Sequence, residues 1–386
     1  MQNSAKSDLY ANLPDDLLEE ILTDAPELAN KIIPLFQQLE EQKQSIHAKL
    51  EENKFLRNVS ELENSTSPSV AAVDGGQAIE KSLGADILMA VGVGVEGLVR
   101  EDKRRWTGIQ HKSWSEVLPH QSESNPKIAR GAMTALELLV VADTPHDVVI
   151  ADGSHQTPII GINSLTSMSS LDDPLHKKIM LDIVERFQII SSLKKSMENS
   201  NIVYMVKYDS SQDIVQTILN QFSLTVDDKT VMTLTLKPDE FTTPLHVGQT
   251  PKTREVWSNL NISISQKIEE TNEITHLKSK LNQAISMPKS RRIYFTYYKP
   301  YEWSPAYRIE LKESCAKNEI ELAKVLKAVK EQVVSPEIQE PYPQYLADMM
   351  AKSISGGLDA LRAVVQSQIG DNENMLRIIT QSYRTY

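Results

Sequence analysis

The sequence predicts an α/β fold with a mixed sheet flanked by helices, and three observations support this class. Two short apolar segments, residues 70–73 and 148–152, are typical of buried strands followed by glycine. A helix predicted from Asn125, with proline at its first turn, lies between them. A second helix, over about 174–197, precedes another apolar strand at 201–207. Strands and helices that alternate in this way indicate parallel crossover connections within one sheet.

Several further segments complete the predicted sheet. Apolar residues alternate over 85–99, which predicts a long strand, and 110–117 supplies an antiparallel neighbour. The remaining β-prone segments are 230–236, 292–298 and 307–311. Residues 240–290 are interpreted as an insertion that contains a polar helix over 265–285, and a last helix begins near Tyr345.

The first 65 residues differ from the rest in composition. They predict two amphipathic helices, one after Pro14 and one kinked at Pro34, followed by a solvated segment rich in Glu, Gln and Lys. Residues 63–68 have the composition of a linker. We therefore predict a helical extension over 1–65, which serves dimer or partner docking, and a main domain over 66–386.

Composition and charge exclude several classes of protein. The chain has 386 residues, of which 40% are hydrophobic and 24% charged, as in soluble globular proteins. We expect no membrane contact and a cytoplasmic location, because there is no apolar run of about 18 residues and the acidic N-terminus does not resemble a signal peptide. A single cysteine, Cys315, excludes an internal disulfide and a cysteine-rich zinc site. The net charge of −11 argues against a protein that coats nucleic acid by itself.

Asp74 directly follows the first apolar segment, and Asp152 ends the second. Asp74 and Asp152 are each followed by glycine, and we expect Asp74 to end its strand at a double-glycine turn. An apolar strand that runs into Asp-Gly is most often only a turn, but two such strands can present two carboxylates to one site. Glu137, at the edge of a predicted apolar helix face, is either a rim salt bridge or a ligand that points inward.

The chemistry of oxygen ligands narrows the possible functions. Carboxylates without a His or Cys cluster select hard ions such as Mg²⁺ or Mn²⁺. Two such ions about 4 Å apart align water, phosphate and leaving oxygen for phosphodiester hydrolysis. The sequence has neither a Gly-x-Ser-x-Gly elbow nor a phosphate-binding Gly-x-x-x-x-Gly-Lys loop, so a serine hydrolase and an NTPase are disfavoured.

These motifs, taken in order over residues 68–366, resemble the NurA nucleases. The resemblance rests on Val-Ala-Ala-Val-Asp74-Gly-Gly, the helix with Arg130 and Glu137, Val-Val-Ile-Ala-Asp152-Gly-Ser, the strand ending in Lys207, Ile-Tyr-Phe-Thr-Tyr-Tyr with Tyr-Arg-Ile-Glu310, and Pro341-Tyr-Pro-Gln-Tyr-Leu-Ala-Asp348. It implies a ribonuclease H-like core, a manganese-dependent DNA nuclease acting on single-stranded and double-stranded ends, and a homodimer docked on a hexameric HerA-type ATPase. It matches Asp74, Glu137 and Asp152 to the metal ligands, with Mn²⁺ (or Mg²⁺) as the cofactor.

The C-terminal motif departs from the pattern of the family. Members often read Tyr-Pro-Tyr-Pro-Leu-x-x-Ala followed by His or Asp, whereas Glu340 replaces the first Tyr, Gln344 replaces the Leu and Asp348 takes the last place. Asp348 is either a further catalytic residue or an acid in the first turn of a helix. Glu340 is either an extra ligand or, as we predict, a surface residue.

The resemblance leads to a functional hypothesis with one main alternative. We predict that Asp74 and Asp152 hold the ions, that Glu137 completes the site and orients water, and that Asp348 assists. The predicted DNA contacts, each also interpretable as a solvated side chain, are Lys207, Arg104, Arg105, Arg291 and Arg292. Such a nuclease would act in DNA end processing or in anti-phage defence. The alternative is a degenerate NurA-like subunit that docks to the ATPase and regulates it, and a third possibility is a hydrolase of small phosphoesters.

Overall fold

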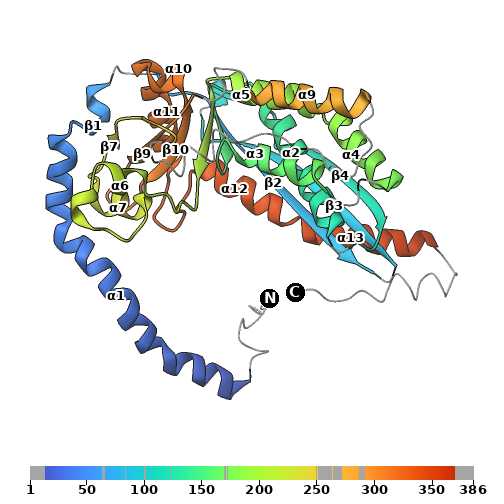
Figure 1. Cartoon of the computed structure of the whole chain (residues 1–386), viewed down its shortest axis with the longest axis horizontal. Coiled ribbons are helices and arrows are strands. Elements are labelled where there is room, and N and C mark those ends of the chain that lie inside the picture. Colours follow the sequence, from blue (N-terminus) through green and yellow to red (C-terminus); the bar gives the residue numbers. More distant parts are fainter. Residues whose placement is uncertain are drawn as a thin grey trace.

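A ten-stranded sheet forms the centre of the protein, and helices cover both of its faces (Figure 1). The computed structural model describes residues 14–62, 66–82, 84–99, 101–121, 123–168, 171, 173–248, 250, 263, 272–286 and 292–369. The strand order is β1-β7-β9-β10-β6-β5-β2-β3-β4, and β8 pairs with β9 outside this path. Among the described helices, none combines the length and the apolar character that a membrane span requires.

The five strands β4-β3-β2-β5-β6 give the sheet its mixed character. The antiparallel part consists of β2 (Val70–Lys81), β3 (Ala85–Glu96) and β4 (Gln110–Pro119). The other two strands, β5 (Val148–Asp152) and β6 (Ile202–Val206), run parallel to β2. Three antiparallel strands followed by two parallel ones are the arrangement expected of a ribonuclease H-like core, so the predicted fold class is confirmed.

Five further strands extend the sheet beyond β6. The predicted strands at 292–298 and 307–311 are confirmed as β9 (Ile293–Lys299) and β10 (Tyr307–Lys312), which pair antiparallel. The sheet then continues through β7 (Glu240–Thr242) to β1 (Leu56–Asn58), while β8 (Leu245–His246) lies beside β9. Segments 56–58 and 240–242 thus belong to the sheet, and the division into 1–65, 66–386 and an insertion at 240–290 stays a prediction.

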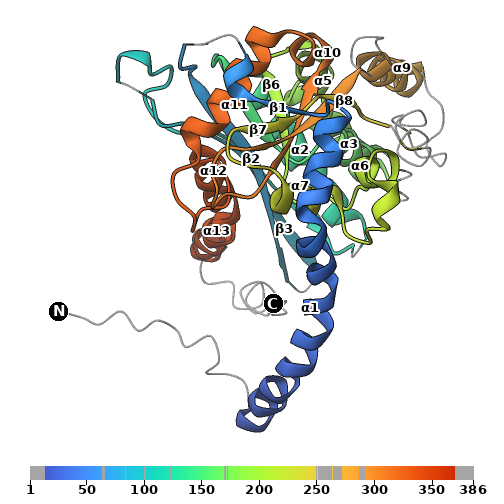
Figure 2. The same ribbon diagram turned by 90° about the vertical axis from the view of Figure 1, so that its left-hand side faces the viewer.

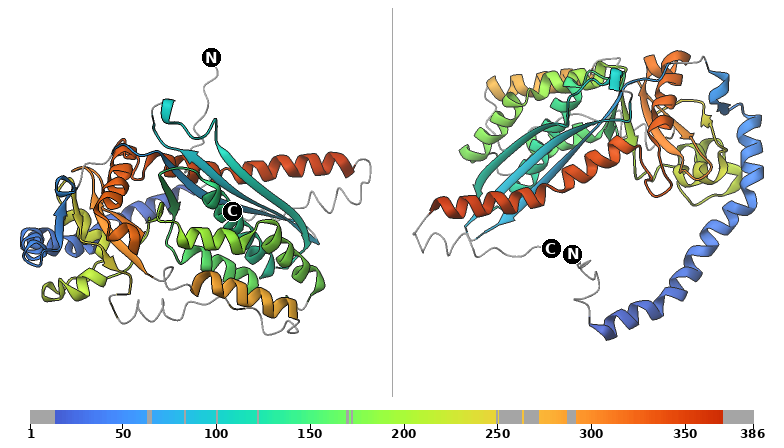
Figure 3. Two further views of the ribbon diagram at one scale, coloured as in Figure 1. Left: turned by 90° about the horizontal axis from the view of Figure 1, so that it is seen from above. Right: turned by 180° about the vertical axis from the view of Figure 1, so that it is seen from behind.

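The two faces of the central sheet carry different helices (Figure 3). One face is covered by α2 (Ser124–Asp143), α3 (Thr157–Thr166), α4 (Pro174–Arg186), α5 (Ile189–Glu198) and α9 (Asn272–Ser286). The other face is covered by α11 (Glu319–Gln332), α12 (Tyr342–Lys352) and α13 (Ile354–Ile369). The short elements are α6 (Asp213–Thr217), α7 (Asp228–Thr235), α10 (Glu313–Ala316), η1 (Val59–Glu61), η2 (Glu101–Lys103) and η3 (Asn220–Phe222).

Three sequence expectations about local structure between residues 66 and 240 are wrong. The strand at Asp74 does not end in a turn but continues to Lys81, because β3 pairs with it along residues 71–81. The segment 230–236 is mostly helix α7, since the Asp227 side chain accepts a hydrogen bond from the Thr230 N–H at 2.8 Å and caps it. The helix predicted over 174–197 breaks into α4 and α5, where the backbone turns left-handed.

The N-terminal region is one long helix, α1 (Asp15–Glu52), rather than two, and both Pro26 and Pro34 lie inside it. Its C-terminal half packs Leu39 and Ile46 into a core shared with α6, α7 and β9. Its N-terminal half extends away from the body of the protein (Figures 1 and 2). The large apolar side chains exposed on that half are Leu17, Ile21, Leu22, Leu28, Ile32, Ile33 and Phe36.

Candidate metal centre

The candidate site lies at the carboxyl ends of β5 and β6, the strands that run parallel to β2. Val73 pairs with Ala151, and Asp152 pairs with Met205, so this register brings Asp74, Asp152 and Lys207 to one end of the parallel strands. Side chains two residues apart on a strand share a face. The residues two positions before Asp74, Asp152 and Lys207 pack in one core with α11, so all three side chains point to the face that α11 and α12 cover.

The Lys207 ammonium lies among four carboxylates. Its Nζ is 3.9 Å from Asp74 Oδ2, 3.4 Å from Asp152 Oδ1, 3.1 Å from Glu340 Oε2 and 3.2 Å from Asp348 Oδ1. We refer to these four acids and Glu137 as the carboxylate cluster. The expectation of a surface position for Glu340 is wrong, because its carboxylate faces Lys207 and only 28% of its side chain is exposed.

Helix α12 and Glu340, which lies two residues before it, supply one side of the cluster. Gln344 and Asp348 lie four residues apart on one face of α12, and Glu340, two residues before the helix begins, completes a stripe of polar side chains beside Lys207. Gln344, fully buried, donates from Nε2 to Asp152 Oδ1 at 2.8 Å. Gly76 permits this docking, because a Cβ there would lie 2.1 Å from the Ala351 carbonyl oxygen. Sequence reasoning missed Gln344 as a functional residue, although the four-residue spacing was a usable signal.

Glu137 approaches β2 from the opposite face, on α2. A Cβ at Gly75 would lie 3.2 Å from Glu137 Oε2, so glycine lets this carboxylate lie directly over the strand. Burial raises the pKa of Glu137 well above its usual value, and the negative charges of Asp74 and Asp152 raise it further. Gly75 and Gly76 thus allow α2 and α12 to pack closely on opposite faces of β2.

The cluster carries more negative charge than its two ammonium groups neutralise. Burial, and then repulsion from Asp152, raises the pKa of Asp74 to about 7, although Lys207 lowers it. Burial alone would also raise the pKa of Asp348, but Lys352, at 2.6 Å, and Lys207 hold it below its usual value. An all-oxygen donor set with this excess charge fits one or two hard divalent cations.

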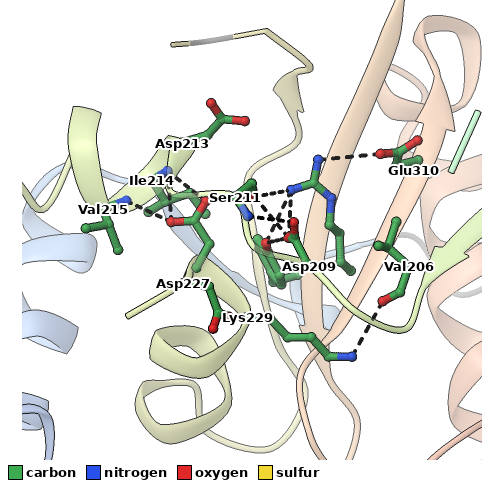
Figure 4. Close-up of polar contacts among 12 residues, drawn as sticks. Val206, Asp209, Ser211, Asp213, Ile214, Val215, Asp227, Lys229 and Glu310 are labelled. Atoms are coloured by element: carbon green, nitrogen blue, oxygen red, sulfur yellow. Dashed lines mark hydrogen bonds and ion pairs between the residues drawn. The ribbon is translucent and has the colours of Figure 1, made fainter. Parts of the chain in front are cut away.

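Hydrogen bonds behind the cluster fix the segment that follows β6 (Figure 4). The buried Arg308 donates to Asp209 Oδ2 at 2.9 Å, and the same oxygen accepts from the Tyr297 hydroxyl. The ammonium of Lys229 donates to the carbonyl oxygen of Lys207 at 2.5 Å. The backbone of Lys207 and of the residues that follow it is therefore held from two sides. None of these supporting residues was identified from the sequence.

The other predicted DNA contacts that the structure describes are not near the cluster. The backbone N–H of Arg105 donates to Glu96, which also bonds His146, just before β5 begins. Arg104 and Arg105 thus lie toward the end of β5 opposite Asp152. Arg292 precedes β9 and pairs with Glu313 at 2.9 Å, while Arg291 lies outside the described residues. Of the predicted contacts that the structure describes, only Lys207 lies at the carboxylates.

Two other features of the described residues could bind ligands. His47, Glu51 and Glu240 form a group between α1 and β7 that could hold a metal ion, with His47 Nε2 3.0 Å from Glu240 Oε2. A cavity of about 720 Å³ between α5 and α9 is lined mainly by apolar surface. We place the chemistry at the carboxylate cluster instead, because its pKa shifts are those of an unneutralised functional site.

Comparison with known proteins extends this assignment at the level of the fold. No protein-family model and no curated protein sequence matches the chain. Among solved structures, the NurA nuclease from Sulfolobus solfataricus is similar at 14% identity and a TM-score of 0.55, covering 92% of this chain and 98% of that one. A NurA structure with manganese is similar at 11% identity and a TM-score of 0.50, covering 89% and 98%. The chain therefore has the fold of the NurA nucleases.

Proposed function

We propose that the protein is a metal-dependent DNA nuclease that hydrolyses phosphodiester bonds. The observation that supports this most is the carboxylate cluster, whose excess negative charge lies where the parallel strands end. The NurA structure with manganese supports Mn²⁺ as the ion, with Mg²⁺ as the substitute. The same cluster speaks against a degenerate subunit, because Asp74, Glu137 and Asp152 are all retained.

The residues at and around the cluster have the following proposed roles. Asp74, Asp152 and Glu137 would hold the metal, with Asp348 assisting. A bound divalent ion lowers the pKa of water and neutralises charge on the phosphate. Gln344 orients Asp152 through its hydrogen bond. Lys207 contributes a positive charge that attracts the phosphate of the substrate.

The substrate would enter beside Lys207. A pocket of about 590 Å³ there is lined by Lys207, Tyr208 and Lys229, among others. Tyr208 is 95% exposed, so its ring is available for stacking on a base. Because the chain as a whole carries a charge of −11, DNA binding would depend on such local cations and on a partner that delivers the strand.

The first test is cleavage of end-labelled linear DNA by the purified protein with Mn²⁺, Mg²⁺ or EDTA. We expect degradation that requires the metal, and a loss of at least roughly 100-fold in Asp152→Asn, because this change removes a charged ligand. Asp182→Asn, on the exposed side of α4, is the matched control and should cleave like the wild type. A wild type that binds Mn²⁺ yet stays inert, even with its ATPase, would favour the degenerate subunit instead.

We also propose that the exposed N-terminal half of α1 is the homodimer contact. Large apolar side chains along that half, such as Leu22 and Ile32, are more than half exposed. An apolar surface of this extent on a projecting helix is typical of a protein interface. A hexameric HerA-type ATPase, a role in repair or defence and a cytoplasmic location remain proposals that rest on the family resemblance.

This contact predicts a concentration-dependent dimer in sedimentation velocity experiments. Leu22→Lys combined with Ile32→Lys should raise the dimer dissociation constant at least roughly 100-fold, because charge would be buried in an apolar interface. Val117→Lys, at an exposed apolar position on β4, should leave the dimer intact. A monomeric wild type, or a double variant that still dimerises like the wild type, would show the assignment to be wrong.

A further inference from the structure

The present position of Lys207 conflicts with a cation in the carboxylate cluster. Its ammonium lies 3.4 Å from Asp152 and 3.9 Å from Asp74, between the two principal proposed ligands. In the described part of the chain, three potential ligand atoms come within 4.8 Å of one another only in the His47, Glu51 and Glu240 group. With the ammonium of Lys207 between them, the carboxylates around it do not form such a group. A divalent ion can bind them only if the ammonium moves away, because like charges this close repel strongly.

A small cavity beside Lys207 offers a place for the ammonium to go. Its volume is about 180 Å³, and its lining includes Lys207, Tyr307, Glu340 and Gln344. Three buried polar atoms of these residues, Tyr307 Oη, Glu340 Oε2 and Gln344 Oε1, have no hydrogen-bond partner among the described residues. Glu340 Oε2 is already an ion-pair partner of Lys207 Nζ, at 3.1 Å, so one acceptor of the cavity contacts the ammonium in its present position. Tyr307 is 3% exposed and Gln344 is fully buried, so bulk solvent does not satisfy them.

Buried acceptors without a partner carry a free-energy cost, so a donor in the cavity would stabilise the protein. A lysine ammonium has three donors and no acceptor. The cavity presents a carboxylate, an amide carbonyl and a hydroxyl oxygen, which together match those three donors. The carboxylate also supplies the charge that a buried ammonium requires.

We propose that this cavity is a second seat for the Lys207 ammonium, which moves there when a divalent cation binds Asp74 and Asp152. Tyr307, Glu340 and Gln344 are then positioning residues, since they act on the metal through Lys207. The inference rests on the proposed metal chemistry and deepens it. It also gives a role to Glu340, which the proposed metal binding leaves without one.

Lys229 is a second cation at this cavity, but its donors are directed elsewhere. Its ammonium donates to the carbonyl oxygen of Val206 at 3.5 Å (Figure 4). It also donates to the carbonyl oxygen of Lys207 at 2.5 Å. It therefore fixes the backbone of Lys207, while the side chain of Lys207 changes its rotamer in the proposed movement. A buried water is the competing occupant, because it would satisfy the same three oxygens. If the Lys207 ammonium occupies the cavity, a change in the cavity affects metal binding only when Lys207 is present. If water occupies it, the effect is the same with and without Lys207.

The test is a double-mutant cycle read by calorimetric Mn²⁺ binding to the full-length protein. Tyr307→Phe removes one acceptor of the cavity without changing charge and without touching a proposed ligand. It should weaken Mn²⁺ binding roughly tenfold when Lys207 is present and leave it unchanged in Lys207→Met. Lys207→Met alone should bind Mn²⁺ more tightly than the wild type, because no ammonium then competes. In EDTA, Tyr307→Phe should melt within about 2 °C of the wild type, which confirms that it folds.

The other outcomes have defined meanings. An equal loss in both backgrounds would assign the cavity to water and overturn the second seat. Unchanged Mn²⁺ binding in Tyr307→Phe, or weaker binding in Lys207→Met, would overturn it as well. If the wild type bound no Mn²⁺ at all, the proposed function would fail together with this inference. Binding without coupling between Tyr307 and Lys207 would remove the inference alone and leave the nuclease intact.

Discussion

Asp74→Asn is expected to abolish DNA cleavage and, at the same time, to raise the melting temperature of the metal-free protein at neutral pH. The buried carboxylate is repelled by Asp152, and its pKa is raised from a usual value of 3.8 to about 7. Its ionised form is therefore disfavoured in the folded state. Asparagine keeps the shape of the side chain, removes the charge and so relieves this repulsion, but it also removes a proposed metal ligand.

The pH dependence of stability gives the sign of this effect. Between about pH 4 and pH 7, the folded protein binds a proton at Asp74 more tightly than the unfolded chain does. The contribution of Asp74 to the free energy of unfolding therefore falls as the pH rises through that range, and it is lowest above pH 7. A difference of roughly 3 pKa units corresponds to at most about 4 kcal/mol, which sets the upper limit of the gain.

Thermal unfolding in EDTA from pH 4 to pH 8 measures this gain. The difference in melting temperature between Asp74→Asn and the wild type should be near zero at pH 4 and reach its full value above pH 7. Asp182→Asn should show no such trend, because that carboxylate is exposed. A variant that is less stable than the wild type at pH 8 would mean that Asp74 contributes to folding rather than opposing it.

Gly76→Ala is expected to destabilise the protein by about 3 kcal/mol and to remove DNA cleavage. The added Cβ would lie 2.1 Å from the carbonyl oxygen of Ala351, and backbone atoms cannot rotate out of its way. Helix α12 would have to shift, and its stripe of Glu340, Gln344 and Asp348 would shift with it. Misplacement of catalytic groups by about 1 Å costs roughly 100-fold in rate.

Gly356→Ala is the matched control for this substitution. Gly356 lies in α13, and no described atom is within 4 Å of a Cβ built there. Alanine should therefore raise the free energy of unfolding by up to about 1 kcal/mol and leave cleavage unchanged. Chemical denaturation measures the free energy of unfolding of both variants, and the cleavage assay measures their activity. Gly76→Ala with wild-type stability and activity would contradict the close docking of α12 on β2.

Local pattern predicted the strands that define the site, because their residues are apolar on both faces. The segments 70–73 and 148–152 are buried by helices on each side, which produces continuous apolar runs that the sequence displays directly. Parallel pairing then follows from the intervening helix, and with it the alignment of Asp74 and Asp152 at one end of the strands. The fold class and these two carboxylates were thus accessible without a structure.

The rest of the site depends on contacts between distant parts of the chain. The segment 230–236 has the β-branched residues of a strand, but the Asp227 cap and burial of Val231 and Met232 make it helical. The position of Glu340 is set by how α12 docks on Gly76, more than 260 residues earlier, which no local pattern encodes. The cavity proposed to receive the Lys207 ammonium is lined by Tyr307, on strand β10, and by Gln344, on helix α12. Hydrophobic periodicity cannot predict a contact between these two elements.

The adjacent glycines of β2 also determine the order in which the parts of the carboxylate cluster assemble during folding. Because neighbouring strand residues face opposite ways, Gly75 receives α2 from one face and Gly76 receives α12 from the other. Helix α2 follows β2 closely in the chain, whereas α12 is made some 260 residues later. A nascent chain can therefore form the sheet, with Asp74, Glu137 and Asp152 in place, well before the last acids and Gln344 arrive. The three proposed metal ligands would thus be assembled before α12 docks, and Glu340, Gln344 and Asp348 would join them only at that later step.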